Sequence, residues 1–336
     1  MENKFELALV DGSFMLKRSA AMVAKGRDPK TVRPGEILTL IIQTLRKAAR
    51  DYGITCSKYI FVWDQWKPEW GGYWRTYLMK DFGNYKGTRS YWNEEKIESL
   101  RRDPEVSAFE LAGLESEYEM HCLREKTKRA IVEDFWKLGI LSYEYPGYEA
   151  DDIITLATHS LLNHQTSPYV IISKDTDLHY SLTPMTYFYK VGSKEEDLVG
   201  YDQMWEKVPM GIKATGISLY QYKAYLESLS VTHNDMTRTL KPGKDVNMAI
   251  LKIMDGDFSD LSDPLAFKAQ FGTFDLWSFP DVDQVLSDIS GFPVRGIYPD
   301  MTGWNEVRKK YGIFRISDDY FYEFSKGFDQ KLFCDR

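Results

Sequence analysis

Short apolar runs that end in an acidic residue recur through the first 200 positions of the chain. Three of them have the length and apolar content of buried strands, and they cover residues 7–10, 58–63 and 168–173. The strand-end acids that follow them include Asp11, Asp64 and Asp175. Ligands of open α/β sheets bind at the carboxyl ends of parallel strands. We therefore expect these carboxylates at one edge of a sheet, provided that the strands are neighbours.

Helical periodicity separates these runs. A helix predicted over residues 37–52 is apolar on one side, at positions 37, 38, 41, 42 and 45. Further helical patterns cover residues 92–137, 153–162, 282–289 and 304–311, and further strands are predicted at 138–145 and 187–191. Strands that alternate with helices predict an α/β fold with a central, mainly parallel sheet flanked by helices.

We divide the chain at residue 200. Residues 1–200 are expected to form the α/β core, and residues 201–336 a helical C-terminal region, because helical patterns replace strands from Tyr201 onward. Residues 65–88 are rich in glycine and aromatic residues without a clean period, so an irregular segment is predicted there.

The densest acidic stretch stands where a predicted strand gives way to a helix. Glu149, Asp151 and Asp152 fall within four residues, and at helical spacing Glu149 and Asp152 share a face. Acids at a helix start can cap its free N–H groups. Asp11 can likewise bond its own backbone in the turn that Gly12 signals. Three acids beside a strand also suit a cation, so both interpretations stay open.

Two acidic pairs lie further along the chain. Asp175 and Asp177 directly follow a predicted strand, and Asp257 and Asp260 stand in a Gly-Asp-x-x-Asp turn. Closely spaced carboxylates can bind one cation or bridge two. An EF-hand is excluded, because its ligand ladder and closing Glu are missing around Asp257.

A third kind of motif combines an aromatic ring with two cations, at Tyr85, Lys86 and Arg89. Rings stack on exposed bases and cations meet phosphates, so the motif suits a nucleic-acid strand. A solvated loop is the alternative. Around this motif, 12 basic and 12 acidic side chains balance one another between Lys67 and Arg129, which argues against a strongly basic surface.

The composition excludes several classes of protein. Hydrophobic residues make up 43% of the chain and aromatic residues 15%, which excludes a disordered protein. Three cysteines without CxxC spacing indicate neither a disulfide framework nor a zinc site. The first residues lead into a strand-like segment with interspersed charges, and no apolar stretch approaches about 18 residues, so we expect neither a signal peptide nor a membrane span. We therefore expect a cytoplasmic protein that does not bind membranes. The net charge of −7 opposes phosphate binding, but it becomes +2 when the nine candidate metal ligands named above are left out, and bound divalent cations would make the active face more positive still.

These motifs together resemble the 5′ nuclease family, which comprises flap endonucleases, the 5′ nuclease domain of bacterial DNA polymerase I and bacteriophage 5′ exonucleases. The motifs stand in the family's order at residues 10–12, 62–64, 85–89, 149–152, 173–177 and 256–260. Chain length and the helical tail look most like the T-even bacteriophage ribonuclease H branch. That branch would place the protein in the cytoplasm of a bacterial host.

The resemblance implies a role for each motif. One metal site would be formed mostly by Asp11, Asp64, Glu149, Asp151 and Asp152. The cluster around the second would be completed by Asp175, Asp177, Asp257 and Asp260. The catalytic residues would be Lys86, Arg89 and Asp152, with Lys86 and Arg89 at the scissile phosphate beneath a helical arch over residues 65–129. Tyr85 would contact an unpaired nucleotide.

The implied chemistry is hydrolysis of phosphodiesters with two metal ions. Oxygen ligands without His or Cys favour Mg²⁺, with Mn²⁺ as a substitute, over zinc. The resemblance adds 5′-3′ exonuclease and 5′-flap activity on branched or nicked duplex DNA and on RNA/DNA hybrids, as in primer removal during replication. It also adds partners such as a sliding clamp or a single-strand-binding protein. A monomer is the expected state.

One departure from the family pattern follows Asp260. Family members usually continue with Asn and a glycine-rich helix-hairpin-helix that holds duplex backbone, whereas residues 261–267 lack those glycines. We therefore expect a degenerate duplex-binding hairpin within residues 201–336.

Three other classes of protein compete with this resemblance. PIN-type ribonucleases share acids at strand ends, but they are usually much shorter and lack the motifs at residues 85–89 and 256–260. A non-catalytic protein that binds branched DNA is opposed by the nine acids, because unused clustered carboxylates only destabilise a fold. Phosphotransfer by a nucleotide-binding enzyme is opposed by the absence of its glycine-rich motifs.

Overall fold

The computed structural model describes residues 3–70, 72–78, 92–161, 168–192, 198–214, 218–220, 222–223, 276–292 and 301–313. The chain divides into two compact units. The first unit comprises Met1–Phe61, Ser90–Ser142 and Arg295–Arg336, and the second comprises Val62–Arg89 and Tyr143–Val294. Both units are therefore built from segments that are distant in the sequence.

Six strands form a mainly parallel sheet flanked by helices, which confirms the predicted fold class. Three strands are neighbours in the order β3-β2-β1, namely β3 (Ile140–Tyr143), β2 (Ile54–Val62) and β1 (Asn3–Asp11). The other three follow the order β4-β5-β6, namely β4 (Tyr169–Ser173), β5 (Thr186–Lys190) and β6 (Leu198–Gly200). β4 runs parallel to β5, whereas β6 is antiparallel to β5. All five residues of β4 are buried, as expected for a strand covered on both faces.

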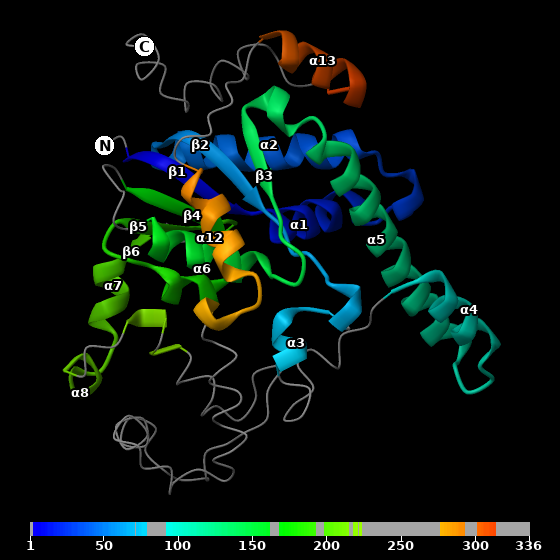
Figure 1. Ribbon diagram of the computed structural model, residues 1–336. Coiled ribbons are helices and arrows are strands. Elements are labelled where there is room, and N and C mark those ends of the chain that lie inside the picture. The colour runs from blue at the N-terminus through cyan, green and yellow to red at the C-terminus, as the bar shows by residue number, and fades with distance from the viewer. Residues whose placement is uncertain are drawn as a thin grey trace, which may run out of the picture. The chain divides into compact units, whose positions relative to one another are not determined.

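Helices α1 (Gly12–Ala24), α2 (Pro34–Tyr52) and α5 (Ala108–Val132) pack against one another in the first unit (Figure 1). The predicted apolar side of α2 is buried, and the helix ends at Tyr52, directly before Gly53, whose φ of 62° is left-handed. The prediction of a turn after β1 is wrong, because Gly12 is the first residue of α1. The Asp11 carboxylate accepts a hydrogen bond from Phe14 N at 2.8 Å, so Asp11 caps a helix rather than closing a turn.

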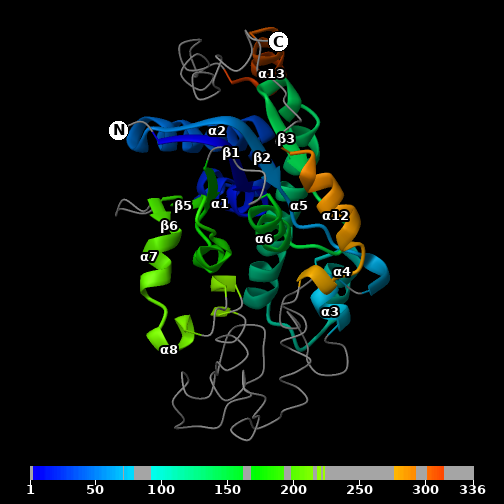
Figure 2. The same cartoon turned by 60° about the vertical axis from the view of Figure 1, so that its left-hand side comes forward.

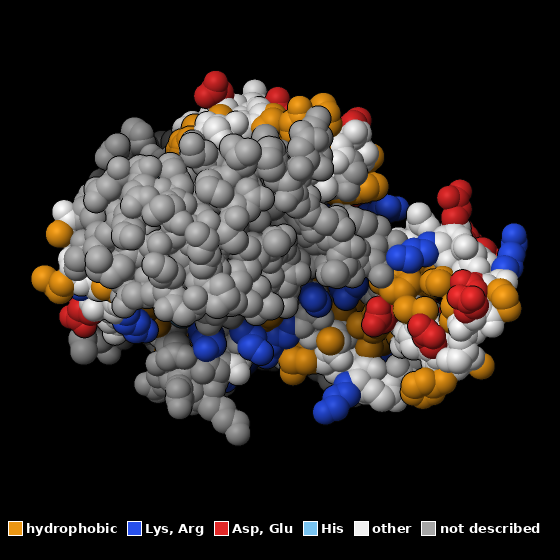
Figure 3. Space-filling view, turned by 90° about the horizontal axis from the view of Figure 1, so that it is seen from below, with side chains coloured by type: hydrophobic (Ala, Val, Ile, Leu, Met, Phe, Trp, Pro, Cys, Tyr) orange, Lys and Arg blue, Asp and Glu red, His pale blue; other side chains and the backbone are white. Residues whose placement is uncertain are grey.

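The charged region over residues 92–137 is helical, as predicted, and contains α4 (Glu94–Arg102), α5 and the 3₁₀ turn η3 (Phe135–Leu138). α4 runs beside α5 (Figure 1). Acidic and basic side chains lie together at the right of Figure 3, where Figure 1 shows α4. This mixture agrees with the even charge balance of the sequence, and the face of α4 seen in Figure 3 carries charges of both signs.

The last described helix of the first unit, α13 (Met301–Tyr311), is held against the residues that follow α5. The Asp134 carboxylate, which is 4% exposed, accepts from Lys310 Nζ at 2.5 Å and from the Tyr311 hydroxyl at 2.7 Å. Lys137 Nζ lies 3.2 Å from the same carboxylate. One buried acid thus connects two segments that are far apart in the sequence.

Helix α6 (Ala150–Ser160) of the second unit is largely buried, and α12 (Val282–Ser290) packs beside it (Figure 2). The 3₁₀ helix η5 (Thr176–Ser181) contacts α6, and the hydroxyls of Thr155 and Thr158 bond to Ser181. Shorter elements of the chain are η1 (Pro29–Thr31), η2 (Pro68–Trp70), α3 (Trp74–Leu78), α7 (Tyr201–Glu206), α8 (Met210–Lys213) and η6 (Leu276–Ser278). Among the described residues, none of the helices combines the length and the apolar character needed to span a bilayer.

Candidate functional site

The segment that leaves β2 folds back onto the loop before α6. Gln65 N donates to the Tyr148 carbonyl at 3.0 Å, and Gly147 N donates to the Gln65 carbonyl at 2.8 Å. Trp74 N donates to the Gly147 carbonyl at 2.8 Å. Gly147 has a left-handed φ of 86°, and a Cβ on residue 147 would come within 2.7 Å of the Trp74 ring. These bonds fix Asp64 and α3 beside the first residues of α6.

Two of the predicted acids cap the start of α6. Asp64, which is partly buried, accepts from Ala150 N at 2.8 Å through Oδ1. Asp152 accepts from Glu149 N at 3.0 Å through Oδ2. The free N–H groups of a helix start require such acceptors. The capping interpretation is therefore confirmed for this stretch, with one oxygen of each of these two carboxylates accepting a backbone N–H. Asp151 lies in the same first turn and is partly buried.

A cation lies between the two carboxylates that share a helix face. Arg75 Nη2 is 2.5 Å from Asp152 Oδ1, and Arg75 Nη1 is 3.5 Å from Glu149 Oε2. All three residues are buried, with exposures of 7% for Arg75, 6% for Glu149 and 1% for Asp152. The guanidinium also lies 5.8 Å from the Phe279 ring centroid. Burying charges is tolerated only when they are paired, so this ion pair stabilises the arrangement of the two acids.

Tyr148, in the loop before α6, connects this loop to residues 279 and 280. Its hydroxyl donates to the Pro280 carbonyl at 2.8 Å, and its ring packs against Phe279. Burial, followed by the negative charges of Asp152 and Asp281, raises the pKa of Tyr148 well above its usual range. The hydroxyl therefore stays a proton donor at neutral pH and acts as a structural anchor.

The other predicted ligands are distributed over both units. Asp11 lies at the end of β1 in the first unit and is buried. Asp175 is exposed in the second unit and caps η5 by accepting from Asp177 N at 3.0 Å. Asp177 lies 3.6 Å from Lys223 Nζ. The strand-end position predicted for Asp11 and Asp175 is confirmed, and both carboxylates also serve as local caps.

Within the described ranges, no group of three Asp, Glu, His or Cys side chains is arranged to hold a metal ion. Five of the predicted site residues lie outside these ranges, namely Tyr85, Lys86, Arg89, Asp257 and Asp260. The complete ligand set thus stays a prediction. The oxygen donors around α6 are of the kind that divalent cations bind, since all of them are carboxylate oxygens. Two of these carboxylates, Glu149 and Asp152, already lie around one positive group, the Arg75 guanidinium.

Arg75 was missed by the sequence analysis, although a signal for it exists. It follows Tyr73 and Trp74 directly in an aromatic run. A cation embedded in such a run is expected to be buried and therefore to need an acidic partner. Its partners, 74 and 77 positions further along the chain, could not be identified from local spacing.

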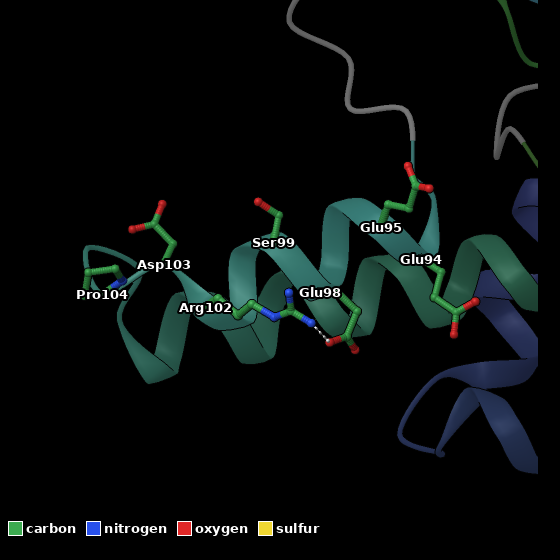
Figure 4. A pocket seen from close by; sticks show the side chains of 7 residues that line it. All are labelled: Glu94, Glu95, Glu98, Ser99, Arg102, Asp103 and Pro104. Atoms are coloured by element: carbon green, nitrogen blue, oxygen red, sulfur yellow. Dashed lines mark ion pairs between the residues drawn. The ribbon is translucent and has the colours of Figure 1, made fainter.

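A groove over α4 offers no alternative site for a phosphate. Figure 4 shows its lining, which consists of Glu94, Glu95, Glu98, Ser99, Arg102, Asp103 and Pro104. The one cation of this lining, Arg102, is 3.8 Å from Glu98 and is thereby paired. Four acidic side chains around one paired cation repel anions, so this groove does not suit a nucleic-acid backbone.

Most of the predicted site residues fall within a region that matches a known protein family. A family model described as "5'-3' exonuclease, N-terminal resolvase-like domain" matches residues 6–209, a range that holds all the predicted site residues except Asp257 and Asp260. None of the curated proteins matches the chain.

Similar solved structures include the bacteriophage T5 5′-exonuclease with bound zinc, at 14% identity and a TM-score of 0.48, with 97% of this chain and 98% of that chain covered. They include the bacteriophage T5 D15 flap endonuclease with DNA and metal ions, at 14% identity and a TM-score of 0.47, with 97% and 100% covered. The catalytic core of Rad2 with a DNA substrate has 16% identity and a TM-score of 0.40, with 92% and 78% covered.

Proposed function

The chain belongs to the 5′-3′ exonuclease family, and from this premise we propose that it hydrolyses phosphodiesters from a free 5′ end or at a 5′ flap. The proposed substrates are branched or nicked duplex DNA and RNA paired with DNA, and the proposed role is primer removal in replication. The observation that carries the proposal is the buried pair of carboxylates of Glu149 and Asp152, which both meet the Arg75 guanidinium at the start of α6.

The proposed ligands around α6 are Asp64, Glu149, Asp151 and Asp152, together with Asp11. The second set consists of Asp175, Asp177, Asp257 and Asp260. Mg²⁺ is the proposed ion, with Mn²⁺ as a substitute, because the donors are carboxylates only. Two such ions would lower the pKa of an attacking water and stabilise the leaving oxygen.

The chain itself contributes orientation and charge. Hydrogen bonds from Ala150 N to Asp64 and from Glu149 N to Asp152 orient these two carboxylates. Lys86 and Arg89 are proposed to neutralise the negative charge that grows on the phosphate during hydrolysis. Tyr85 is proposed to stack on an unpaired base.

Other expectations stay predictions. They are the T-even branch, the arch over residues 65–129, the division at residue 200, the degenerate hairpin, the cytoplasmic location, the monomeric state and the replication partners.

The test is cleavage of a 5′-labelled flap duplex in Mg²⁺, with the native protein, Asp152→Asn and Asp283→Asn. Asp283 is an exposed residue of α12 and is not one of the proposed ligands, so its variant makes the same exchange of charge outside the proposed ligand set. We expect the native protein and Asp283→Asn to cut near the junction. Asp152→Asn should lose at least about a hundredfold in rate while it still binds the duplex.

Two results would replace the proposal. If the native protein binds the branch but cuts with neither Mg²⁺ nor Mn²⁺, it is a non-catalytic binding protein. If it cuts single-stranded RNA internally and ignores the flap, it is a PIN-type ribonuclease.

A further inference from the structure

We propose that Arg75 is an internal counter-ion of the candidate metal centre. Its guanidinium holds Glu149 and Asp152 in place in the metal-free protein, and a divalent cation binds to these carboxylates in competition with it. This inference rests on the proposed function, because it takes Glu149 and Asp152 as metal ligands.

The position of Arg75 is set by the backbone around it. Trp74, the residue before it, is bonded through its N–H to Gly147, and the Trp74 ring packs on Gly147. Gly147 itself precedes Glu149 by two residues. The segment that carries the cation and the segment that carries the acids are therefore fastened together directly beside the ion pair.

The electrostatics explain why such a cation is needed. Glu149 and Asp152 are both buried, and each would repel the other if no positive charge lay between them. Water solvates neither of them well at exposures of 6% and 1%. The Arg75 guanidinium meets both carboxylates with separate nitrogen atoms, as its planar fork allows. The metal-free site is thereby kept assembled.

The same contacts produce the competition. One oxygen of Asp152 accepts from Glu149 N, and the other is 2.5 Å from Arg75 Nη2. A divalent cation that binds the second oxygen meets a positive charge already there, and like charges at this distance repel strongly inside a protein. Metal binding therefore requires that Arg75 withdraw from Asp152, which lowers the affinity for the ion.

The experiment measures thermal unfolding of the full chain in EDTA and across a Mg²⁺ titration, without nucleic acid. It compares the native protein with Arg75→Gln and Arg75→Lys. The control is Lys67→Gln, because Lys67 is a cation of the same segment with different partners. Its Nζ lies 3.8 Å from the Asp281 carboxylate and 4.3 Å from the Trp74 ring centroid. This readout follows metal binding itself and does not depend on cleavage.

We expect Arg75→Gln to melt several degrees below the native protein in EDTA. Mg²⁺ should then stabilise it more than it stabilises the native protein, with a half-saturating concentration roughly tenfold lower. Arg75→Lys reaches one carboxylate at a time, so its half-saturating concentration should fall between the two. Lys67→Gln should keep the native Mg²⁺ dependence.

The inference is overturned if both Arg75 variants need as much Mg²⁺ as the native protein, or more, since Arg75 would then be a structural ion-pair partner only. If Arg75→Gln does not fold in EDTA, the comparison of Arg75→Lys with the native protein decides in the same way. A native protein that cuts the flap and is stabilised by Mg²⁺ keeps the proposed function even when the Arg75 variants fail this test. A native protein that neither cuts nor responds to divalent cations overturns both.

Discussion

Replacing Gly147 by alanine tests the packing that joins the two segments of the candidate site. The residue has a φ of 86°, a conformation that costs an alanine about 1–2 kcal/mol. The added Cβ would also lie 2.7 Å from Trp74 Cε2 and 2.8 Å from Trp74 Nε1. Trp74 is only 2% exposed and cannot move freely, so overpacking adds about 1–3 kcal/mol. Together these effects lower the free energy of unfolding by about 2–5 kcal/mol.

The assay is urea unfolding followed by far-UV circular dichroism, with two matched glycine variants. Gly26 has a φ of 72° and no atom within 4 Å of the position that a Cβ would take, so Gly26→Ala should cost the conformational part alone, about 1–2 kcal/mol. Gly113 lies inside α5 with open space around it, and Gly113→Ala should stabilise the protein by up to about 1 kcal/mol. The reasoning is refuted if Gly147→Ala costs no more than Gly26→Ala.

Two further predictions concern pH and a buried acid. Burial lowers the pKa of His159 to about 4, so between pH 6.5 and 4 the unfolded chain binds a proton that the folded chain does not. The free energy of unfolding should therefore fall by about 3 kcal/mol as the pH drops through this window. Urea unfolding at pH 7 and at pH 4.5 should show a smaller loss for His159→Leu than for the native protein. An equal loss in the two proteins would contradict this assignment. Burial alone would raise the pKa of Asp134, but hydrogen bonds from Lys310, Tyr311 and Lys137 outweigh it and lower the pKa. Asp134 thus stabilises the fold above its ordinary pKa and loses this contribution in acid, and Asp134→Asn should cost about 1–3 kcal/mol in urea unfolding at pH 7. Equal stability of this variant and the native protein at pH 7 would show that the hydrogen bonds that Asp134 accepts from Lys310 and Tyr311 do not stabilise the position of α13.

Local patterns explain which elements the sequence predicts. The apolar stripe of α2 and the buried run of β4 follow from periodicity, since each buries a face that its own residues define. The common face of Glu149 and Asp152 follows from helical spacing in the same way. β6 escaped prediction because its three residues depend on pairing with β5 rather than on a pattern of their own. α1 escaped because Gly12 signals a turn until Asp11 is seen to cap a helix.

Long-range contacts limit how much of the candidate site can be predicted from the sequence. Asp64 bonds to Ala150 N, and Arg75 pairs with Glu149 and Asp152, across separations that no local rule connects. The sequence therefore predicted that Glu149 and Asp152 share a face and that a helix begins there, while their role as metal ligands stays a prediction. It did not predict the cation, because burial of Arg75 depends on how distant segments pack.

The most direct test of the account is to locate bound ions by anomalous diffraction from crystals of the native protein soaked in Mn²⁺. The account predicts an anomalous peak within about 2.5 Å of carboxylate oxygens of Glu149 and Asp152, with the Arg75 guanidinium withdrawn from Asp152. A protein that cleaves flap duplexes in Mn²⁺ but shows no ion at these carboxylates would contradict the central claim, because its catalytic centre would then lie elsewhere.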